Sequence, residues 1–374
     1  MIYLDNAATT PTSPEAMKAA WPWLTSEFGN ASSHHELGHR ASVALQQSRE
    51  TVANFLGCRS SEIVFTSGGT ESDNLGIIGL ALAYPRGRHI VTSPTEHEAV
   101  LASVDYLQRM HGFDVTYLAV DHTGSISLNE LRAAMRSDTT LVTLMIGNNE
   151  VGTTHPISEF STIAHEFGAL FHCDAVQGIG WTPINVNELG VDALSISGHK
   201  IHAPKGIGAL YVKISLSIEP LIHGGGQEIG RRSGTENVAW AVALATAVTA
   251  LAHVDNEKII EFRDNFIAGV LQSIPRARLT GHPIHRLAHV ASFVFDGVSG
   301  ESVLIALEEK GVLCSSGSAC AAGSDKPSHV LLALGFDPDL AKTAVRFSFS
   351  HSTTSQELNQ AQLILRDFFA GLNS

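Results

Sequence analysis

The first 255 residues alternate short apolar runs with stretches of helical periodicity, and this alternation restricts the possible folds most strongly. Most of the apolar runs are continuous, which is typical of strands that are covered on both faces. Repeated strand–helix–strand units predict a mainly parallel sheet with right-handed crossovers. The predicted strands are Glu62–Ser67, His89–Ser93, Val115–Val120, Leu141–Gly147, Leu170–Asp174, Ala193–Ser197 and Ala209–Val212, and the predicted helices between them include Thr95–Met110, Ser127–Met135 and Pro156–Phe167.

An Ala-rich helix over Asn237–Val254 closes this region, and the rest of the chain predicts a smaller α/β unit. We therefore expect an α/β protein with a seven-stranded, mainly parallel sheet in its larger part. The elements predicted for the smaller part are helices Asn256–Ser273, Glu301–Lys310, Ser328–Leu334 and Ser355–Leu372, strands Val290–Phe295 and Thr343–Ser348, and a loop over Ser315–Ser324.

Charge and cysteine content exclude several classes of protein. The formal charge of −13 argues against direct nucleic-acid binding, which needs clustered Lys and Arg. The most apolar stretch, Val238–Ala252, is shorter than the roughly 20 residues of a membrane helix, so we expect no membrane span. The N-terminus shows no secretory signal, and none of the four cysteines forms a CxxC pair. We expect a cytoplasmic, reducing location and no zinc-ribbon or other metal site.

Three polar residues, Thr70, Asp174 and Lys200, lie at or just after the carboxyl ends of predicted strands. Parallel sheets bind their ligands at these strand ends. A Lys at a buried strand end, such as Lys200, can act as an amine nucleophile and form the Schiff base of pyridoxal phosphate. Asp174 could face the pyridinium nitrogen, and Thr70, in a Gly-rich turn before a helix, could hold the phosphate. Taken alone, Lys200 would more often be a solvated surface lysine; the combination of the three favours a cofactor site.

Other strand-end residues fit the same site less specifically. His97 could stack on a cofactor ring and exchange protons, although a chain with 19 histidines contains many bystanders. Asn149 and Gln177 could bind cofactor or substrate, or only cap helices and close turns. Cys320 lies in a run of small residues, Cys314–Gly323, which is typical of a mobile loop that could move a thiol over some distance.

A series of short motifs in fixed order resembles the cysteine desulfurases, which share the fold-type I pyridoxal-phosphate class with the class V aminotransferases. The resemblance covers essentially the whole chain. It implies a large cofactor-binding domain of residues 15–255 and a small domain of residues 1–14 and 256–374, with Cys320 on a long mobile loop. The motifs are Leu4–Pro11, Phe65–Asn74, Thr95–His97, Asn148–Gly152, His172–Gln177, Ser197–Lys200, Arg232–Thr235, Ser315–Cys320 and Arg346–Ser348.

The resemblance also implies residue roles. Lys200 would bond to the cofactor, Asp174 would face its ring nitrogen, Gln177 its ring hydroxyl, and His97 would stack on the ring and move protons. Cys320 would be the nucleophile. The further cofactor contacts would come from Gly69, Thr70, Ser197, His199 and Asn149, and from Thr235 toward the phosphate of a partner subunit, which implies a homodimer. Arg346, with Asn149, would bind the substrate carboxylate.

The implied reaction converts L-cysteine to L-alanine and leaves a persulfide on Cys320 for transfer to an acceptor protein. Iron–sulfur cluster assembly, tRNA thiolation and DNA sulfur modification all draw on such enzymes. The alternatives are a class V aminotransferase or a selenocysteine lyase on the same fold, and a non-catalytic binding protein. Two departures from the family's pattern stand out: Gly69 replaces a common Ala, and Ala203 replaces a common Gly.

Overall fold

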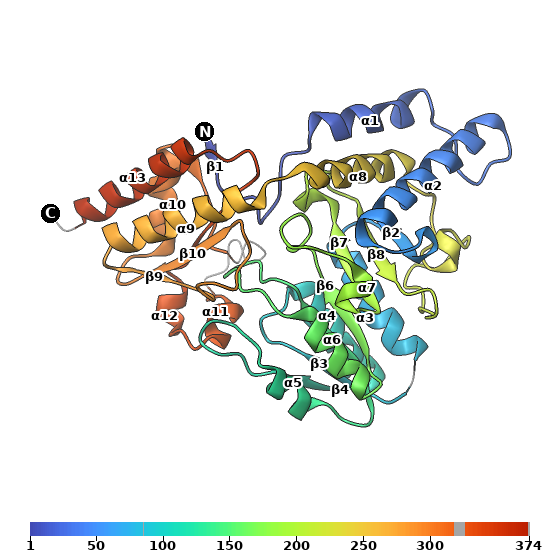
Figure 1. Cartoon of the computed structure of the whole chain (residues 1–374), viewed down its shortest axis with the longest axis horizontal. Helices are drawn as coiled ribbons and strands as arrows, with labels where there is room; N and C mark the ends of the chain where they lie inside the picture. The colour runs from blue at the N-terminus through green and yellow to red at the C-terminus, as the bar shows by residue number, and fades with distance from the viewer. Residues whose placement is uncertain (85, 318–325, 373–374) are drawn as a thin grey trace.

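The computed structural model describes residues 1–84, 86–317 and 326–372, and its largest sheet has seven strands (Figure 1). Their order is β2-β8-β7-β6-β5-β3-β4; β8 runs antiparallel to both of its neighbours, and the pairs from β7 to β4 are parallel. The predicted mainly parallel sheet of seven strands is confirmed. Its strands are β2 (Ile63–Thr66), β3 (His89–Thr92), β4 (Asp114–Tyr117), β5 (Thr139–Met145), β6 (Leu170–Asp174), β7 (Ala193–Ser197) and β8 (Gly208–Val212).

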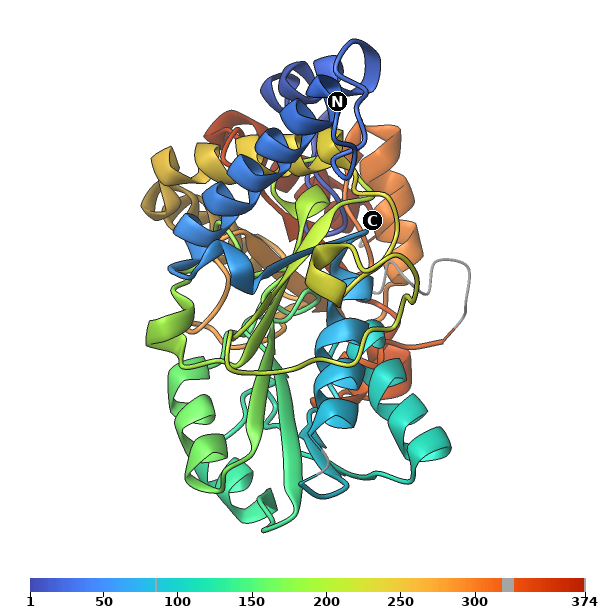
Figure 2. The ribbon, with the colours of Figure 1, turned by 90° about the vertical axis from the view of Figure 1, so that its right-hand side faces the viewer.

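Helices cover both faces of this sheet, which explains why most of its strands are rich in apolar residues. The edge strand β4 is the exception, since its residues are exposed or half-buried. Val64 and Ile90 pack with Leu75 and Val104 of α3 and α4 on one face. The other face packs against α2, α5, α6 and α8. Figure 2 shows α3 and α4 on one side of the sheet and α6 on the other. These helices are α2 (Glu36–Leu56), α3 (Gly69–Ala83), α4 (Glu98–His111), α5 (Leu128–Ala134), α6 (Ile157–Glu166) and α8 (Val238–Ala250).

The C-terminal part forms a second core around a three-stranded antiparallel sheet in the order β12-β10-β9. Its strands are β9 (Ala277–Leu279), β10 (Val290–Phe295) and β12 (Val345–Ser348). The chain's first residues join this part, because β1 (Ile2–Tyr3) pairs in parallel with β11 (Val312–Leu313). The helices are α9 (Asn256–Ser273), α10 (Gly300–Glu309), α11 (His329–Ala333), α12 (Pro338–Ala341) and α13 (Ser355–Gly371).

Several elements differ from the predicted ones. The helix predicted from Thr95 begins only at Glu98, because His97 is its N-cap. The predicted Asn237–Val254 helix ends as α8 at Ala250 and continues as a 3₁₀ turn, η4 (Leu251–His253). The sequence analysis did not foresee α1 (Pro14–Thr25), α2, α7 (Val186–Leu189), α12, or the short strands β1, β9 and β11. Three further 3₁₀ turns are η1 (Ser60–Glu62), η2 (Gly198–Lys200) and η3 (Glu228–Gly230).

Within the described ranges, no single helix is long and apolar enough to cross a membrane; α8 with η4 and α9 pass that test of length and composition only as a pair bent by 77°.

Candidate active site

The sheet topology brings the predicted site residues to one edge. β7, β6, β5 and β3 are parallel neighbours, so the residues that follow their carboxyl ends lie side by side. β2 also ends there, because Thr66 and Ser197 both pair with Gly208 of β8. This edge therefore collects the predicted residues that follow five strands: Gly69 and Thr70, His97, Asn149, Asp174 and Gln177, and Ser197, His199 and Lys200.

The start of α3 and the end of β7 form a cradle suited to a phosphate group. The Ser197 hydroxyl is buried and has no hydrogen-bond partner among the described residues. A Cβ atom built on Gly69 would lie 3.8 Å from the Ser197 Oγ and only 2.8 Å from Val176 Cγ2. An Ala at position 69 would therefore require the Val176 side chain to shift. Thr70 is exposed in the first turn of α3, where backbone N–H groups favour an anion.

Lys200 is held by the N-terminal segment rather than solvated. Its Nζ donates hydrogen bonds to the carbonyl oxygens of Ala7 and Ala8, the latter at 2.9 Å. Ala7 O also accepts a hydrogen bond from Gln177 Nε2 at 2.9 Å. The half-buried ammonium group and the Gln177 carboxamide therefore share one acceptor. Sequence reasoning missed the two carbonyl groups, since a backbone oxygen carries no residue signal.

Opposing effects act on the pKa of the Asp174 carboxyl group. Burial raises the pKa of its carboxyl group, while the charges of His97 and Lys200 and a hydrogen bond from Val176 N at 2.9 Å lower it. Burial is the largest of these effects and leaves the pKa of Asp174 above its usual value, while the Lys200 charge favours the carboxylate that a protonated ring nitrogen needs. His97 accepts a hydrogen bond from Ala99 N at its Nδ1, 3.1 Å away, so the neutral ring carries its proton on Nε2.

His199 is held as a neutral imidazole. Burial and the charges of Lys200 and Lys205 lower its pKa to about 4. Its Nδ1 lies 3.1 Å from Thr9 Oγ1, and its carbonyl oxygen accepts hydrogen bonds from Thr10. The N-terminal segment therefore fixes both Lys200 and the residue before it.

Arg346 is buried at the junction of the two sheets. Its Nη2 donates to Asp5 Oδ1 at 2.8 Å, and its Nη1 donates to the carbonyl oxygens of Asn149 (2.7 Å) and Gly317 (3.1 Å). The Nε–H group is buried without a partner among the described residues, so the guanidinium keeps a donor for a ligand carboxylate. Asn149 thus meets Arg346 through its backbone, and Asp5 is an acidic partner that the sequence analysis did not identify.

Glu150 is a second residue to which sequence reasoning gave no role. It is buried, and its Oε2 accepts a hydrogen bond of 2.5 Å from Ser328 Oγ. Burial raises the pKa of its carboxyl group, against the opposing charges of His329, Arg346 and His97. Glu150 therefore belongs to the polar surroundings of His97 and Arg346.

Two further predicted residues are Thr235 and Cys320. Thr235 is exposed; Arg232, three residues before it, pairs with Glu71 of α3 at 2.8 Å. Cys320 lies outside the described residues. The described cysteines, Cys58, Cys173 and Cys314, are free, and burial raises the pKa of the Cys314 thiol well above its usual value.

The described residues fit pyridoxal phosphate. A partnerless buried hydroxyl at Ser197, the space left by Gly69 at a helix N-terminus, a buried carboxylate and a half-buried lysine lie at one sheet edge. The phosphate would be held by the α3 N-terminus, Thr70, Ser197 and neutral His199. Lys200 and Asp174 would hold the ring.

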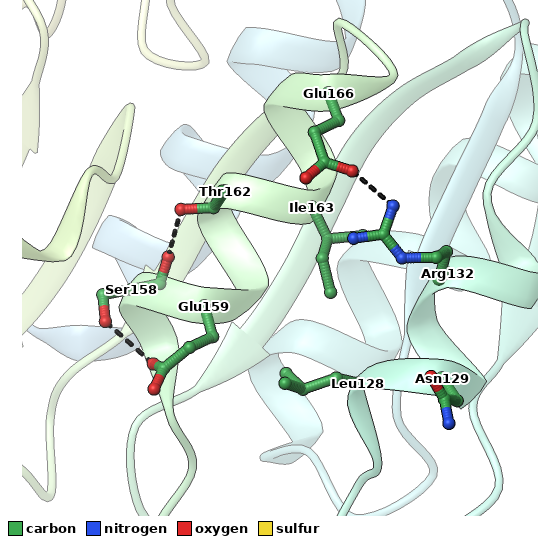
Figure 3. A pocket seen from close by; sticks show the side chains of 8 residues that line it. All are labelled: Leu128, Asn129, Arg132, Ser158, Glu159, Thr162, Ile163 and Glu166. Carbon is green, nitrogen blue, oxygen red and sulfur yellow. Dashed lines mark hydrogen bonds and ion pairs between the residues drawn. The ribbon is translucent and has the colours of Figure 1, made fainter.

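A separate surface hollow lies between α5 and α6 (Figure 3). Arg132 of α5 reaches across it to pair with Glu166 of α6. None of the predicted site residues lines this hollow.

The family of class V aminotransferases matches residues 2–360 of the chain. A protein of Dictyoglomus turgidum named cysteine desulfurase IscS is 46% identical over 362 residues, which cover 96% of this chain and 92% of that protein. A Methanosarcina thermophila protein of the same name is also 46% identical, over 96% of this chain and 89% of its own length.

Solved structures agree with this result. A structure described as a NifS-like protein superposes with a TM-score of 0.91 at 34% identity and covers 99% of both chains. Another, described as SspA in complex with cysteine, gives a TM-score of 0.84 at 36% identity and covers 95% of this chain and all of its own.

Proposed function

Because the chain belongs to the class V aminotransferase family and, within it, to the cysteine desulfurases, we propose that it moves the sulfur of L-cysteine to Cys320 and releases L-alanine. The observation that carries the proposal is the convergence of three groups at one sheet edge: Lys200, Asp174, and a buried Ser197 hydroxyl that has no partner in the described part of the chain. The similar proteins are named cysteine desulfurases, which favours desulfuration over transamination. The cysteine at position 320 favours it too, because transamination needs no thiol.

The residues at this sheet edge, together with Arg346, have distinct roles in the proposed reaction. Bound pyridoxal phosphate supplies an electron sink conjugated with the α-carbon of the substrate. Lys200 binds the cofactor and then accepts and returns protons at Nζ. His97 exchanges a proton at Nε2, because its Nδ1 is occupied by Ala99 N–H. Gln177 orients the ring, and Arg346, through its available Nε–H, holds the substrate carboxylate.

Cys320 performs the sulfur transfer. Its thiolate forms a sulfur–sulfur bond with the substrate thiol, and the carbon–sulfur bond of the substrate breaks. The electron pair of that bond stays with the carbon, which takes up a proton and becomes the methyl group of alanine. Cys320 is left as a persulfide, and an acceptor protein thiol then takes the terminal sulfur.

The assembly follows from the same proposal. Thr235 is exposed, and we assign it to the phosphate of a second copy, so the enzyme would be a homodimer with shared sites. The two domains would be residues 15–255 and residues 1–14 with 256–374; the separate cores around the two sheets support this division. A reducing cytoplasm suits the free cysteines of the described chain.

Replacing Cys320 by serine tests the division of labour. A serine hydroxyl keeps the size but forms almost no alkoxide near neutral pH, so Cys320→Ser should release no sulfide and no alanine. The variant should keep the visible absorption of bound pyridoxal phosphate and its shift when L-cysteine is added. Absorbance spectra and alanine assays measure the two halves separately.

Cys314→Ala is the matched control. Cys314 lies six residues earlier, but its half-buried side chain packs against the second core and its thiol has a raised pKa. The Cys314→Ala variant should therefore keep the wild-type rate of turnover. Sulfide release by Cys320→Ser at the wild-type rate would show that Cys320 is not the nucleophile. Loss of the cofactor spectrum in Cys320→Ser would show that the residue is structural.

A further inference from the structure

Three aromatic side chains form a stack where the two sheets meet. The Trp181 ring lies between His289 and His351, with ring centroids 4.2 and 4.1 Å apart and interplanar angles of 16° and 10°. Trp181 follows β6 of the seven-stranded sheet, whereas His289 immediately precedes β10 and His351 follows β12. The stack therefore connects the part of the chain that carries Lys200 to the part that carries Arg346.

One end of the stack touches a residue of the proposed cofactor site. His289 Nε2 lies 3.4 Å from Gln177 Oε1, and the Nδ1 of His289 is buried without a partner among the described residues. At the other end, His351 Nε2 is 2.9 Å from Asn256 Oδ1, and Asn256 Nδ2 donates to Gly180 O at 3.1 Å. The stack is thus anchored beside Trp181 as well as at Gln177.

The two contacts of the Gln177 carboxamide determine its orientation. Ala7 O can only accept a hydrogen bond, so the amide nitrogen must face it, and the amide oxygen must then face His289. An oxygen needs a donor, so His289 must carry a hydrogen on Nε2. Burial lowers the pKa of His289 well below its usual value, and the nearby charges that add to this effect are those of Arg346, His351, Lys200 and Arg263.

We propose that His289 is a positioning residue that keeps the N–H side of the Gln177 carboxamide turned toward Lys200, and that Trp181 and His351 hold the imidazole in place. This inference rests on the proposed function, in which Gln177 meets the oxygen on the cofactor ring. That oxygen is an acceptor, and a carboxamide turned over would present its own oxygen to it. His289 prevents this by donating from the opposite side.

The test removes the donor and keeps the ring. His289→Phe can still stack on Trp181 but cannot donate to Gln177. In the holoenzyme we expect a shifted visible absorption band and cofactor retention that is about fivefold to tenfold weaker, the value of one ordinary hydrogen bond. His289→Gln, whose amide nitrogen can take the place of Nε2, should restore both. His253→Phe makes the same exchange at an exposed position of η4 outside the stack, and it should leave the band unchanged.

A second measurement does not depend on the cofactor. In the cofactor-free protein, His289→Phe and Gln177→Leu remove the same contact, so their effects on the thermal unfolding midpoint should fall short of additivity in the double variant. Strictly additive changes of the unfolding midpoint would show that the two side chains do not interact. An unchanged absorption spectrum in His289→Phe would show that His289 has no positioning role. A wild-type protein that takes up no pyridoxal phosphate would instead refute the proposed function. The unfolding midpoints of the cofactor-free single and double variants would still show whether His289 and Gln177 are in contact.

Discussion

Lys200 is the residue on which the proposed chemistry depends most, and its side chain is already turned to the carbonyl groups of Ala7 and Ala8. We predict that Lys200→Ala lowers alanine formation by about 10²–10⁴-fold or more, because both the covalent attachment and the proton carrier are lost. Mass spectrometry after borohydride reduction should find cofactor bonded to the wild-type chain and not to the variant. Exposed Lys205 provides the control, and Lys205→Ala should retain activity. Undiminished alanine production by Lys200→Ala would reject the assignment.

His155 is a buried imidazole whose two ring nitrogens have no partner among the described residues. Burial lowers its pKa to about 4, so below pH 6.5 the unfolded chain takes up a proton that the folded chain does not. The stability that His155 confers is therefore complete above pH 6.5 and is lost as the pH falls toward 4.

A leucine at position 155 takes up no proton, so His155→Leu should remove this loss of stability at low pH. Each pH unit is worth about 1.4 kcal/mol per proton, so the variant should gain about 2 kcal/mol over the wild type between pH 8 and pH 5. Urea unfolding at the two pH values measures the difference. An equal change in the free energy of unfolding of the two proteins between pH 8 and pH 5 would contradict this prediction.

At the scale of elements, a buried ion pair fastens α2 to the edge of the seven-stranded sheet. Arg49 Nη1 and Nη2 donate to the Glu228 carboxylate at 2.5 and 2.8 Å, and the same carboxylate accepts a hydrogen bond from Phe65 N of β2. Arg49 also donates to Ile63 O at 2.8 Å. One carboxylate thus joins a helix, a strand and the η3 turn.

Glu228→Ala should therefore destabilise the protein by about 3–5 kcal/mol, because it leaves the Arg49 charge buried and unpaired. Arg49→Met combined with Glu228→Ala should recover part of this loss, since no charge then remains in the core. Denaturant unfolding of the single and double variants measures both effects. A double variant that is less stable than Glu228→Ala would show that the pair acts mainly through packing.

The strands of the large sheet were predictable because burial on both faces leaves a continuous apolar run in the sequence. α1 and α2 were not recognised, because α1 contains Pro22 and the buried face of α2 includes polar residues such as Ser48 and Arg49. β1 and β11 are two residues long and exist only as a pair. Polar residues at strand ends predicted which side chains share one sheet edge. Contacts such as that of Asp5 with Arg346 were not predictable, because they join positions far apart in the chain and have no local pattern.

At the scale of the whole molecule, Ile229 is the feature that most favours a second copy. It is 67% exposed and adopts a φ of 59°, which is costly for a β-branched residue, and it lies six residues before Thr235. A partner surface would remove this apolar side chain from water. Ile229→Asp should therefore weaken a dimer that the wild-type chain forms.

Sedimentation at several protein concentrations measures this effect, and alanine formation should fall together with the dimer fraction if sites are shared. Ser217→Asp adds the same charge at an exposed position of the same chain and serves as the control. A wild-type chain that is fully active as a stable monomer would contradict the shared site.

The N-terminal residues that hold Lys200 also make the site slow to assemble. Asn6 lies 342 positions from Ser348, and Ala7 lies 170 positions from Gln177, so these contacts join distant parts of the chain. Contacts of such large sequence separation form late in folding, because the loop between them must close first. A chain that refolds from denaturant should therefore regain its helices before Ala7 and Ala8 take their place beside Lys200.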